Sequence, residues 1–373
     1  MFRVGQKLPL FVIAPVAWFP LQGLIRLIKP HFRPEAPKKE MQQGVEVLHP
    51  LFFSIPGMFK RFDGFFLALS TYAVVKKQHQ KNKIDIIDAH FAYPDGYAAT
   101  LLGKWLNIPV TITLRGTEKR HLESALKKPL LRALDNATRV FSVSDSLKQL
   151  VVLAGADEKK IRVVGNGVDV EKFYAFPKNE TRQLLDLPED AKVIVTVGGL
   201  VERKGFHRVI ECLPALIEDH PNLKYLIVGG ASAEGNWENK LRQQVVDLKL
   251  EAHVNFLGTQ PPEKLKTILS ASDIFVLSTR NEGWANVLLE AMACGLPIVA
   301  TDVGGNAEVI CSEKLGTIIP FDDKAQLKQA IHQALVKDWD IQYLIEYAKE
   351  NSWDRRVEIL VDEFQCISSQ KAS

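Results

Sequence analysis

The sequence predicts an α/β protein with two doubly wound, mostly parallel sheets. Short apolar segments rich in strand formers alternate regularly with helix-type segments along both halves of the chain, which is the pattern of parallel sheets covered by helices. Glycines or polar loops follow several of these strands, at the edge where open α/β sheets bind ligands. The length of 373 residues exceeds one ordinary core and suits two domains of roughly 150 to 200 residues each.

The first half alternates strands and helices up to a glycine-rich turn at 165–169. The apolar run Val110–Leu114 is typical of a strand covered on both faces, and Pro94 suits the first position of a helix. The predicted strands are 9–16, 45–48, 83–89, 110–114, 139–143 and 161–164, and the predicted helices are 63–80, 94–106, 119–134 and one behind Ser144.

The second half begins after a polar, proline-containing stretch at 173–191, whose composition predicts a linker. Predicted strands follow at 192–197, 226–230, 254–258, 273–277 and 298–301, with helices at 206–219, from about Asn286, within 323–349 and at 353–364. We therefore expect domains at 1–172 and 173–348, and a C-terminal segment, 349–373.

Composition excludes several classes of protein. A net charge of +3, with 24% charged residues, is too small to predict nucleic-acid binding. The four cysteines have no paired spacing and no histidines at zinc-site spacing, so we expect reduced thiols, no metal and a cytoplasmic location. Apolar runs end well short of the ~20 residues that a membrane-spanning helix needs.

One segment leaves membrane contact open. Residues 51–66 interleave six phenylalanines with Lys60 and Arg61, a pattern that suits either interior packing or docking on a membrane surface. The first alternative is the commoner use of aromatic stripes. The second would place the protein at the inner face of the plasma membrane.

Two carboxylates mark the stretch from Ser278 to Glu308. Glu282 lies in the loop after the predicted strand 273–277, where a ligand is expected. Glu290 follows among leucine, alanine and methionine on a predicted helix. Burying a carboxylate is costly unless it is hydrogen-bonded, so either a protein cation or the hydroxyl groups of a ligand should satisfy Glu290.

A second loop has the outline of a phosphate site. Gly198 and Gly199 follow the predicted strand 192–197, and Arg203 and Lys204 come just before a predicted helix. Glycines let the backbone approach a ligand, and the free amides of a helix N-terminus attract anions. The pair alone is weak evidence, because exposed cations at this place are often only solvated.

Two further loops follow strands in the first half. His90 ends the predicted strand 83–89 in the segment His-Phe-Ala-Tyr-Pro-Asp-Gly, and Arg115 follows strand 110–114. A lone histidine is usually a satisfied structural group. Arg115 has two open alternatives, a contact with an anionic ligand or a salt bridge with Glu118.

Taken together, these motifs resemble those of the family 4, or group 1, glycosyltransferases. The resemblance rests on the stretch 278–308, on Gly-Gly-Leu-x-x-Arg-Lys-Gly at 198–205, and on the loop containing His90. It implies the GT-B fold, two Rossmann-like domains facing across a cleft, with a final helix that returns to the first domain. It also implies transfer of a sugar, with retained configuration, from a nucleoside diphosphate sugar to a glycan or lipid-linked acceptor in cell-surface polysaccharide synthesis.

The resemblance assigns roles to individual residues. Arg203 and Lys204 hold the diphosphate in place of a metal, Glu282 contacts the sugar and Glu290 holds the ribose. The implied catalytic residues are His90, Glu282, Arg203 and Lys204; the implied donor-binding residues are Gly199, Arg203, Lys204, Glu282, Gly283, Trp284, Asn286 and Glu290; and Arg115 is the implied acceptor contact. No cofactor is expected beyond the donor.

Three departures from the family pattern are visible. Ala285 and Arg115 stand where many relatives have proline and histidine, and the segment 9–20 resembles the second strand of relatives rather than the first. We therefore expect the usual first strand and its glycine-rich loop to be absent. The alternative function is an inactive homologue that binds a nucleotide or a partner protein.

Overall fold

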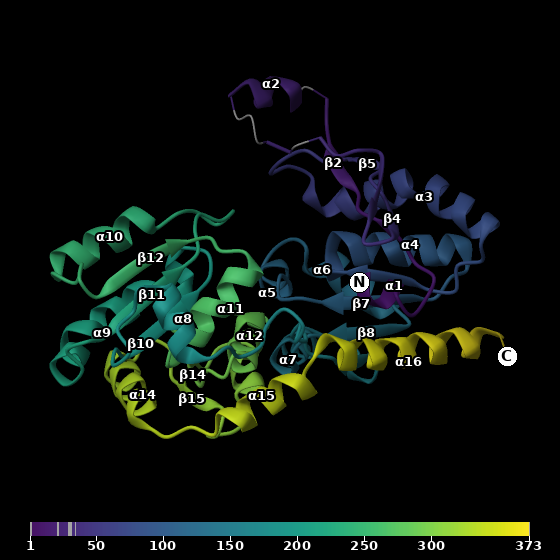
Figure 1. The fold of residues 1–373 in the computed structure, drawn as a ribbon. Coiled ribbons are helices and arrows are strands. Elements are labelled where there is room, and N and C mark those ends of the chain that lie inside the picture. The colour runs from purple at the N-terminus through teal and green to yellow at the C-terminus, as the bar shows by residue number, and fades with distance from the viewer. Residues whose placement is uncertain (1, 21, 29–31, 34, 373) are drawn as a thin grey trace. The chain divides into compact units, whose positions relative to one another are not determined.

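The computed structural model describes residues 2–20, 22–28, 32–33 and 35–372. It confirms an α/β protein with parallel sheets, and the chain forms two compact units (Figure 1). Unit 1 comprises the chain up to Gly165 together with the residues from Arg356 onward, and unit 2 runs from Asn166 to Arg355. These boundaries lie a few residues from those at 172 and 348 that the sequence suggests.

The described residues of unit 1 form three small sheets. The largest is parallel, with strands in the order β6 (Ile87–His90), β7 (Val110–Leu114), β8 (Arg139–Ser142) and β9 (Ile161–Val163). β4 (Val45–Leu48) pairs with β1 (Phe11–Ile13) and β3 (Lys39–Gln42), while β2 (Val16–Trp18) pairs with β5 (Leu51–Phe53). The predicted single strand at 9–16 is therefore wrong, because the chain divides it between two sheets.

The helices of unit 1 surround these sheets. They are α1 (Phe2–Gly5), α2 (Gln22–Ile28), α3 (Asp63–Lys81), α4 (Tyr97–Leu106), α5 (Glu118–Leu122), α6 (Lys127–Asn136) and α7 (Asp145–Leu153), with short turns η1 (Lys60–Phe62), η2 (Ala92–Gly96) and η3 (Glu158–Lys160). The predicted helix 119–134 is two helices. Between them, Ser124 Oγ accepts from the amide of Leu126 at 3.2 Å and supports a turn.

The C-terminal helix α16 (Trp353–Ala372) returns to unit 1, as the sequence predicts. The ring of Phe364 packs edge-on against that of Phe141 on β8, with their centroids 6.0 Å apart. Glu363 forms ion pairs with Arg139 and Arg162 on β8 and β9. The helix thus covers one side of the four-stranded sheet.

Unit 2 contains one six-stranded parallel sheet. The strands are β10 (Val193–Val197), β11 (Lys224–Val228), β12 (Val254–Gly258), β13 (Ile274–Leu277), β14 (Ile298–Thr301) and β15 (Gly316–Ile319), and their order is β12-β11-β10-β13-β14-β15. This is the order of a doubly wound dinucleotide-binding sheet, with its switch point between β10 and β13. The sequence had not predicted β15.

Alternate residues of the strands of unit 2 enter two separate cores. Val193 and Val195 face α11 (Pro262–Ala271), α12 (Asn286–Ala293) and α15 (Ile341–Glu350), whereas Ile194 faces α9 (Phe206–Asp219), α10 (Glu238–Asp247) and α14 (Lys324–Val336). Helix α8 (Lys178–Leu184) packs against α11. The short helices η4 (Glu202–Lys204) and α13 (Asn306–Val309) complete this unit. Burial on both faces explains why its strands are continuously apolar.

The predicted linker at 173–191 is wrong in one respect, because it contains helix α8. Arg182 on this helix is buried and donates to the carbonyl of Ala271 at 3.1 Å and to Asp273 Oδ2 at 2.9 Å. The same carboxylate oxygen accepts from the amide of Val193. A buried ion pair therefore fixes this segment to unit 2.

Candidate functional site

The loops after β10 and β11 meet at the carboxyl edge of the unit 2 sheet, next to its switch point. Gly229 has φ +145°, and a Cβ there would lie 1.8 Å from the carbonyl oxygen of Gly198. Only glycine permits so close an approach of the two backbones. Gly199 lies on the same loop, where a Cβ would meet Ser232 at 3.1 Å.

Gly205 brings the start of α9 against the end of β13. It has φ +77°, and a Cβ there would lie 2.0 Å from the carbonyl oxygen of Ser278. The hydroxyl of Ser278 donates to the carbonyl of Gly205 at 2.7 Å, and the amide of Arg280 donates to the carbonyl of Arg203 at 2.8 Å. These contacts place Arg203 and Lys204 directly beside the loop that carries Glu282.

Glu282 is the centre of a charged cluster. Its Oε1 lies 2.6 Å from Lys204 Nζ and 3.3 Å from Arg203 Nη1, and Thr279 Oγ1 is 3.2 Å away. The backbone of Gly304 lies so close to the same loop that a Cβ at this position would be 1.7 Å from the carbonyl oxygen of Glu282. The structure thus brings together the three charged residues that the sequence placed on two separate loops.

Arg203 has a second carboxylate partner that the sequence did not indicate. Its Nε and Nη2 donate to the two carboxylate oxygens of Glu234 at 2.9 and 2.8 Å, and its Nη1 donates to the carbonyl of Asn281 at 2.8 Å. These hydrogen bonds, which Arg203 donates to Glu234, are the main cause that raises the pKa of Arg203, and they are also the main cause that lowers the pKa of Glu234. No motif marks Glu234, an exposed acid on a separate loop.

Glu290 lies on α12 among core residues. Burial raises the pKa of its carboxyl to about 7. Within the described part of the chain, its carboxylate has no hydrogen-bond or ion-pair partner, so the protein cation that the sequence allowed for is not there. The other partner that the sequence allowed for, the hydroxyl groups of a ligand, stays a prediction.

Three further predicted donor-site residues, Gly283, Trp284 and Asn286, come shortly before Glu290 in the sequence. Trp284 packs against the core, and its indole N–H is buried without a partner among the described residues. Asn286 begins α12, and its Oδ1 accepts from Asn166 Nδ2 at 2.9 Å. Gly283 is half-buried between Glu282 and Trp284.

His90 and Arg115 belong to unit 1, so their sharing one site with the unit 2 residues stays a prediction. Arg115 donates from Nε and Nη2 to His90 Nδ1, at 3.1 and 3.0 Å. His90 Nε2 lies 3.5 Å from Asp88 Oδ2. Glu118 accepts instead from the amide of Gly116 at 2.7 Å. The structure therefore joins Arg115 to His90, a pairing that the sequence did not suggest.

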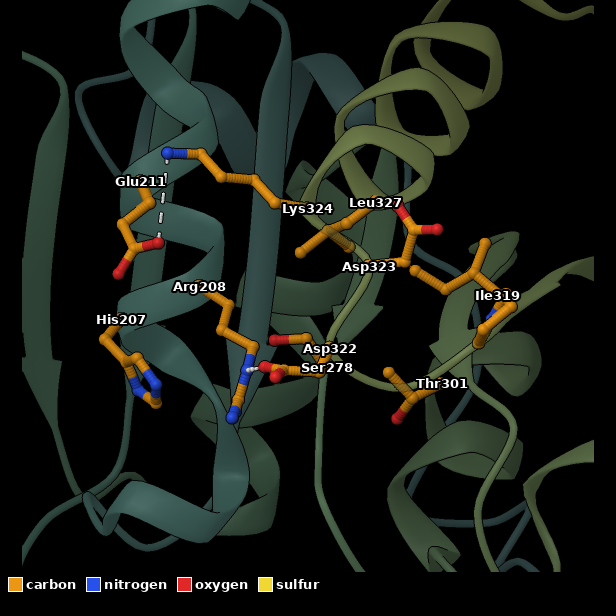
Figure 2. A pocket seen from close by; sticks show the side chains of 11 residues that line it. His207, Arg208, Glu211, Ser278, Thr301, Ile319, Asp322, Asp323, Lys324 and Leu327 are labelled. Carbon is orange, nitrogen blue, oxygen red and sulfur yellow. Dashed lines mark hydrogen bonds and ion pairs between the residues drawn. The ribbon is translucent and has the colours of Figure 1, made fainter.

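Figure 2 shows a separate cavity of about 130 Å³ between α9 and α14, at the same edge of the sheet. Arg208 points across it to Asp322 at 3.3 Å, and Lys324 reaches Glu211 at 3.9 Å. Its lining residues are His207, Arg208, Glu211, Ser278, Thr301, Ile319, Pro320, Asp322, Asp323, Lys324 and Leu327. It contains none of the predicted site residues, and its own charges largely pair with one another.

Two properties bear on metals and membranes. Among the described residues, no three His, Cys, Asp or Glu side chains are grouped so that they could hold a metal ion. The helices of the described chain are all too short or too polar to cross a bilayer.

Comparison with known proteins agrees with this geometry. The family model "Glycosyl transferases group 1" matches residues 177–351, and "Glycosyltransferase Family 4" matches residues 25–172. The chain belongs to the group 1 glycosyltransferases. The first match lies within unit 2 and the second lies mostly in unit 1, and the chain is thus a transferase of the GT-B class.

Similar glycosyltransferases come from several bacteria. The putative teichuronic acid biosynthesis glycosyltransferase TuaC of Bacillus subtilis is 28% identical, over 93% of this chain and 82% of its own. D-inositol 3-phosphate glycosyltransferase of Corynebacterium urealyticum is 29% identical, over 88% of this chain and 82% of its own. The aligned regions thus include most of this glycosyltransferase.

Solved structures share the fold at lower identity. Anabaena HepE in complex with UDP has a TM-score of 0.72 and 19% identity, covering 95% of this chain and 92% of its own. Sucrose-phosphate synthase of Thermosynechococcus elongatus has a TM-score of 0.68 and 20% identity, covering 97% and 98%. The GT-B architecture predicted for this glycosyltransferase is therefore confirmed.

Proposed function

We propose that this glycosyltransferase moves a sugar, with retained anomeric configuration, from a nucleoside diphosphate sugar to a hydroxyl of a glycan or lipid-linked acceptor. The observation that carries the proposal is the cluster of Arg203, Lys204 and Glu282 on the same unit as Glu290, whose carboxylate has no partner among the described residues. Cations suit the diphosphate, and carboxylates suit the hydroxyls of the sugar and the ribose.

The two cations support binding of the diphosphate. A guanidinium and an ammonium both form charge-assisted hydrogen bonds with phosphate oxygens. They immediately precede the N-terminus of α9, where the helix dipole favours negative charge. During transfer, Arg203 and Lys204 would neutralise the charge that develops on the leaving diphosphate. We therefore propose transfer without a metal ion.

The two carboxylates would accept hydrogen bonds from different parts of the donor. Glu282 would accept from sugar hydroxyls once the ligand's phosphates share Lys204 and Arg203 with it. Glu290 would accept from the ribose diol, which satisfies the one acid of this region that the described protein leaves without a partner. No side chain is assigned as a covalent nucleophile. His90 would support the reacting face, and Arg115 would contact the acceptor.

The acceptor and the cellular setting are proposals from relatives. The name of TuaC, a similar protein, refers to teichuronic acid biosynthesis, which supports a cell-surface polysaccharide as the product. HepE has been solved with UDP, so UDP-sugars are the first donors to test. We place this chemistry in the cytoplasm, where nucleotide sugars are made.

Unit 1 has a surface that suits contact with the membrane holding a lipid-linked acceptor. We call it the apolar–basic surface, and it comprises the exposed large apolar side chains of α2, of η1 and the two residues before it, and of α3: Leu24, Leu27, Met58, Phe59, Phe62, Phe65 and Leu69. Leu27 is 80% and Phe59 61% exposed. Exposed apolar clusters of this kind mark interaction sites.

Charge favours an anionic bilayer as its partner. Residues 18–69 contain seven Lys and Arg against four Asp and Glu, which equals the net charge of the whole chain, +3. Arg33 joins the parts of the surface, because Arg26 Nη2 donates to its carbonyl and Arg33 Nη1 donates to the carbonyl of Ser54, both at 2.7 Å. Basic groups beside exposed apolar side chains bind anionic lipid surfaces.

Vesicle sedimentation tests the apolar–basic surface. The wild type should pellet with vesicles containing phosphatidylglycerol and far less with phosphatidylcholine alone. The double variant Leu27→Glu/Phe59→Glu should stay in the supernatant. The control Leu184→Glu, which changes an exposed leucine of unit 2, should behave as the wild type. Equal binding of the double variant would remove this part of the proposal and leave the donor site untouched.

Product analysis tests the reaction. Incubation with each common nucleoside diphosphate sugar and an acceptor mixture should give one glycoside whose anomeric NMR coupling matches the configuration of the donor. An inverted product would contradict retention. Nucleotide binding without turnover of any donor would instead support the inactive homologue, the alternative that the sequence left open.

A further inference from the structure

His90 and Arg115 lie side by side at the carboxyl ends of two paired strands. In the parallel register of β6 and β7, His90 is opposite Thr113, and Arg115 follows on the loop just beyond. Two guanidinium nitrogens, Nε and Nη2, lie 3.1 and 3.0 Å from the single ring nitrogen Nδ1 of His90. Both side chains are half-buried, so water competes weakly for this contact.

The chemistry of the two groups fixes the direction of the hydrogen bond. A guanidinium has only donors and stays protonated in proteins, so His90 Nδ1 must be the acceptor. A histidine that accepts at Nδ1 is neutral and carries its proton on Nε2. That N–H lies toward Asp88, whose Oδ2 is 3.5 Å away and whose Oδ1 accepts from Thr111 at 2.7 Å.

Two neighbours act in opposite directions on the histidine. A carboxylate such as Asp88 favours the imidazolium, whereas Arg115 opposes a second positive charge beside it. Burial, followed by Arg115, lowers the pKa of His90 to about 3, and burial raises the pKa of Asp88 to about 6. Glu118, the other acid of this loop, is buried and held by the amide of Gly116. Burial and Arg115 therefore act together against the imidazolium that Asp88 would favour.

We propose that Arg115 is a positioning residue that holds His90 as the neutral, Nε2-protonated tautomer, so that His90 acts as a hydrogen-bond donor and not as an acid or base. His90 can then donate Nε2–H to an oxygen of a bound ligand over the whole physiological pH range. That consequence rests on the proposed function, whereas the tautomer itself does not. Arg115 acquires a role toward His90 besides the acceptor contact proposed above.

NMR of the imidazole nitrogens tests the tautomer without any substrate. The signals of His90 are identified by their loss in His90→Gln. In the wild type they should show a protonated Nε2 and an unprotonated Nδ1, with no titration between pH 5 and 8. In Arg115→Gln the pKa of the same ring should rise toward its ordinary value of about 6.5, and the remaining burial should keep it below that value. Arg120→Gln, which removes an exposed arginine of α5, should leave the wild-type behaviour unchanged.

The variant Arg115→Lys tests whether the positive charge at position 115, and not the volume of the side chain, keeps His90 neutral. It retains a donor-only cation, so His90 should remain neutral and untitrated in this variant; it also replaces Arg115→Gln as the test if the glutamine variant does not fold. In the pH profile of kcat/KM, the ionisation of His90 should lie at a higher pH in Arg115→Gln than in Arg115→Lys. A wild-type His90 that is protonated at Nδ1, or that titrates between pH 5 and 8, would overturn the proposal. Unchanged His90 signals in Arg115→Gln would do the same.

Discussion

Lys204 Nζ lies 2.6 Å from Glu282 Oε1, so the cation proposed for the diphosphate and the acid proposed for the sugar are each other's partners. Both side chains are largely buried, and a buried charge that loses its partner is costly. The pair therefore holds the two loops in register before a ligand arrives, and a donor sugar diphosphate would join an existing cluster.

The variant Lys204→Met should remove the ammonium group that pairs with Glu282 while keeping an aliphatic side chain of similar length. We expect a loss of kcat of about 10²–10³-fold, because one preorganised charge no longer meets the leaving diphosphate. Unfolding free energy should fall by about 1–3 kcal/mol, because Glu282 keeps only Arg203 and Thr279. Steady-state kinetics and urea denaturation measure the two effects. Arg280→Met, which removes an exposed pair with Glu202, is the control and should change neither appreciably.

Glu234→Gln should tighten binding of the nucleoside diphosphate. Glu234 holds two nitrogens of Arg203, so a phosphate must compete with it for the guanidinium. Glu234 is largely exposed, so its pair is worth at most ~1 kcal/mol, or about five-fold in Kd. Calorimetric titration measures this change, with Glu238→Gln, an exposed acid paired with Arg242, as control. Weaker binding in Glu234→Gln would show that Glu234 assists the ligand.

Glu290→Gln should alter stability and binding in opposite directions. Burial raises the folded-state pKa of Glu290 to about 7 from 4.5, so between these values the folded state retains a proton that the unfolded state has lost. Stability from this group is therefore present below about pH 4.5 and is lost as pH rises through 7. At pH 8 the variant should be more stable than the wild type by on the order of 1–3 kcal/mol, and at pH 4.5 the two should agree. Denaturation at both values measures this.

Nucleotide affinity provides the second readout of Glu290. An ionised carboxylate accepts from the ribose diol better than a neutral one, so wild-type affinity should rise between pH 6 and 8. Glu290→Gln should bind more weakly and lose most of this rise. A rise of equal size in both proteins would assign the pH dependence to another group.

Gly205→Ala should destabilise unit 2 strongly. The new methyl would lie 2.0 Å from the backbone carbonyl oxygen of Ser278, and φ is +77°. Gly258 has a similar φ of +66° but open space around it, so Gly258→Ala measures the cost of the backbone conformation alone, about 1 kcal/mol. We expect Gly205→Ala to cost at least ~2 kcal/mol more. Equal costs would show that β13 and α9 can move apart without penalty.

The sequence predicted the strands of unit 2 except β15, because each of the others carries its own signal. Ile274–Leu277 is apolar throughout, Ile298–Thr301 is apolar up to its last residue, and both are followed by polar loops, so local pattern and burial agree. The proximity of Lys204 and Glu282 also follows from local signals. Their loops come after β10 and β13, two strands that pair in parallel and therefore end at the same edge of the sheet.

Features that depend on distant residues were missed. Helix α8 looks polar, and its anchor Arg182 is intelligible only beside Asp273, far along the chain. Glu234 reaches Arg203 from another loop, and Arg115 meets His90 across two strands. The split of residues 9–16 between two sheets likewise depends on their partners β4 and β5. Long-range pairing of polar groups leaves no periodic signal in the sequence.

The most direct test of the proposed donor site is calorimetric titration of UDP, GDP and ADP into the wild type, Arg203→Ala, Glu290→Ala and Arg280→Ala. We predict that one nucleotide binds the wild type and Arg280→Ala equally. Affinity for it should fall at least about ten-fold in each of the other two variants, a loss of ~1.4 kcal/mol or more. If folded Arg203→Ala and Glu290→Ala bound that nucleotide as tightly as the wild type, the donor site would lie elsewhere.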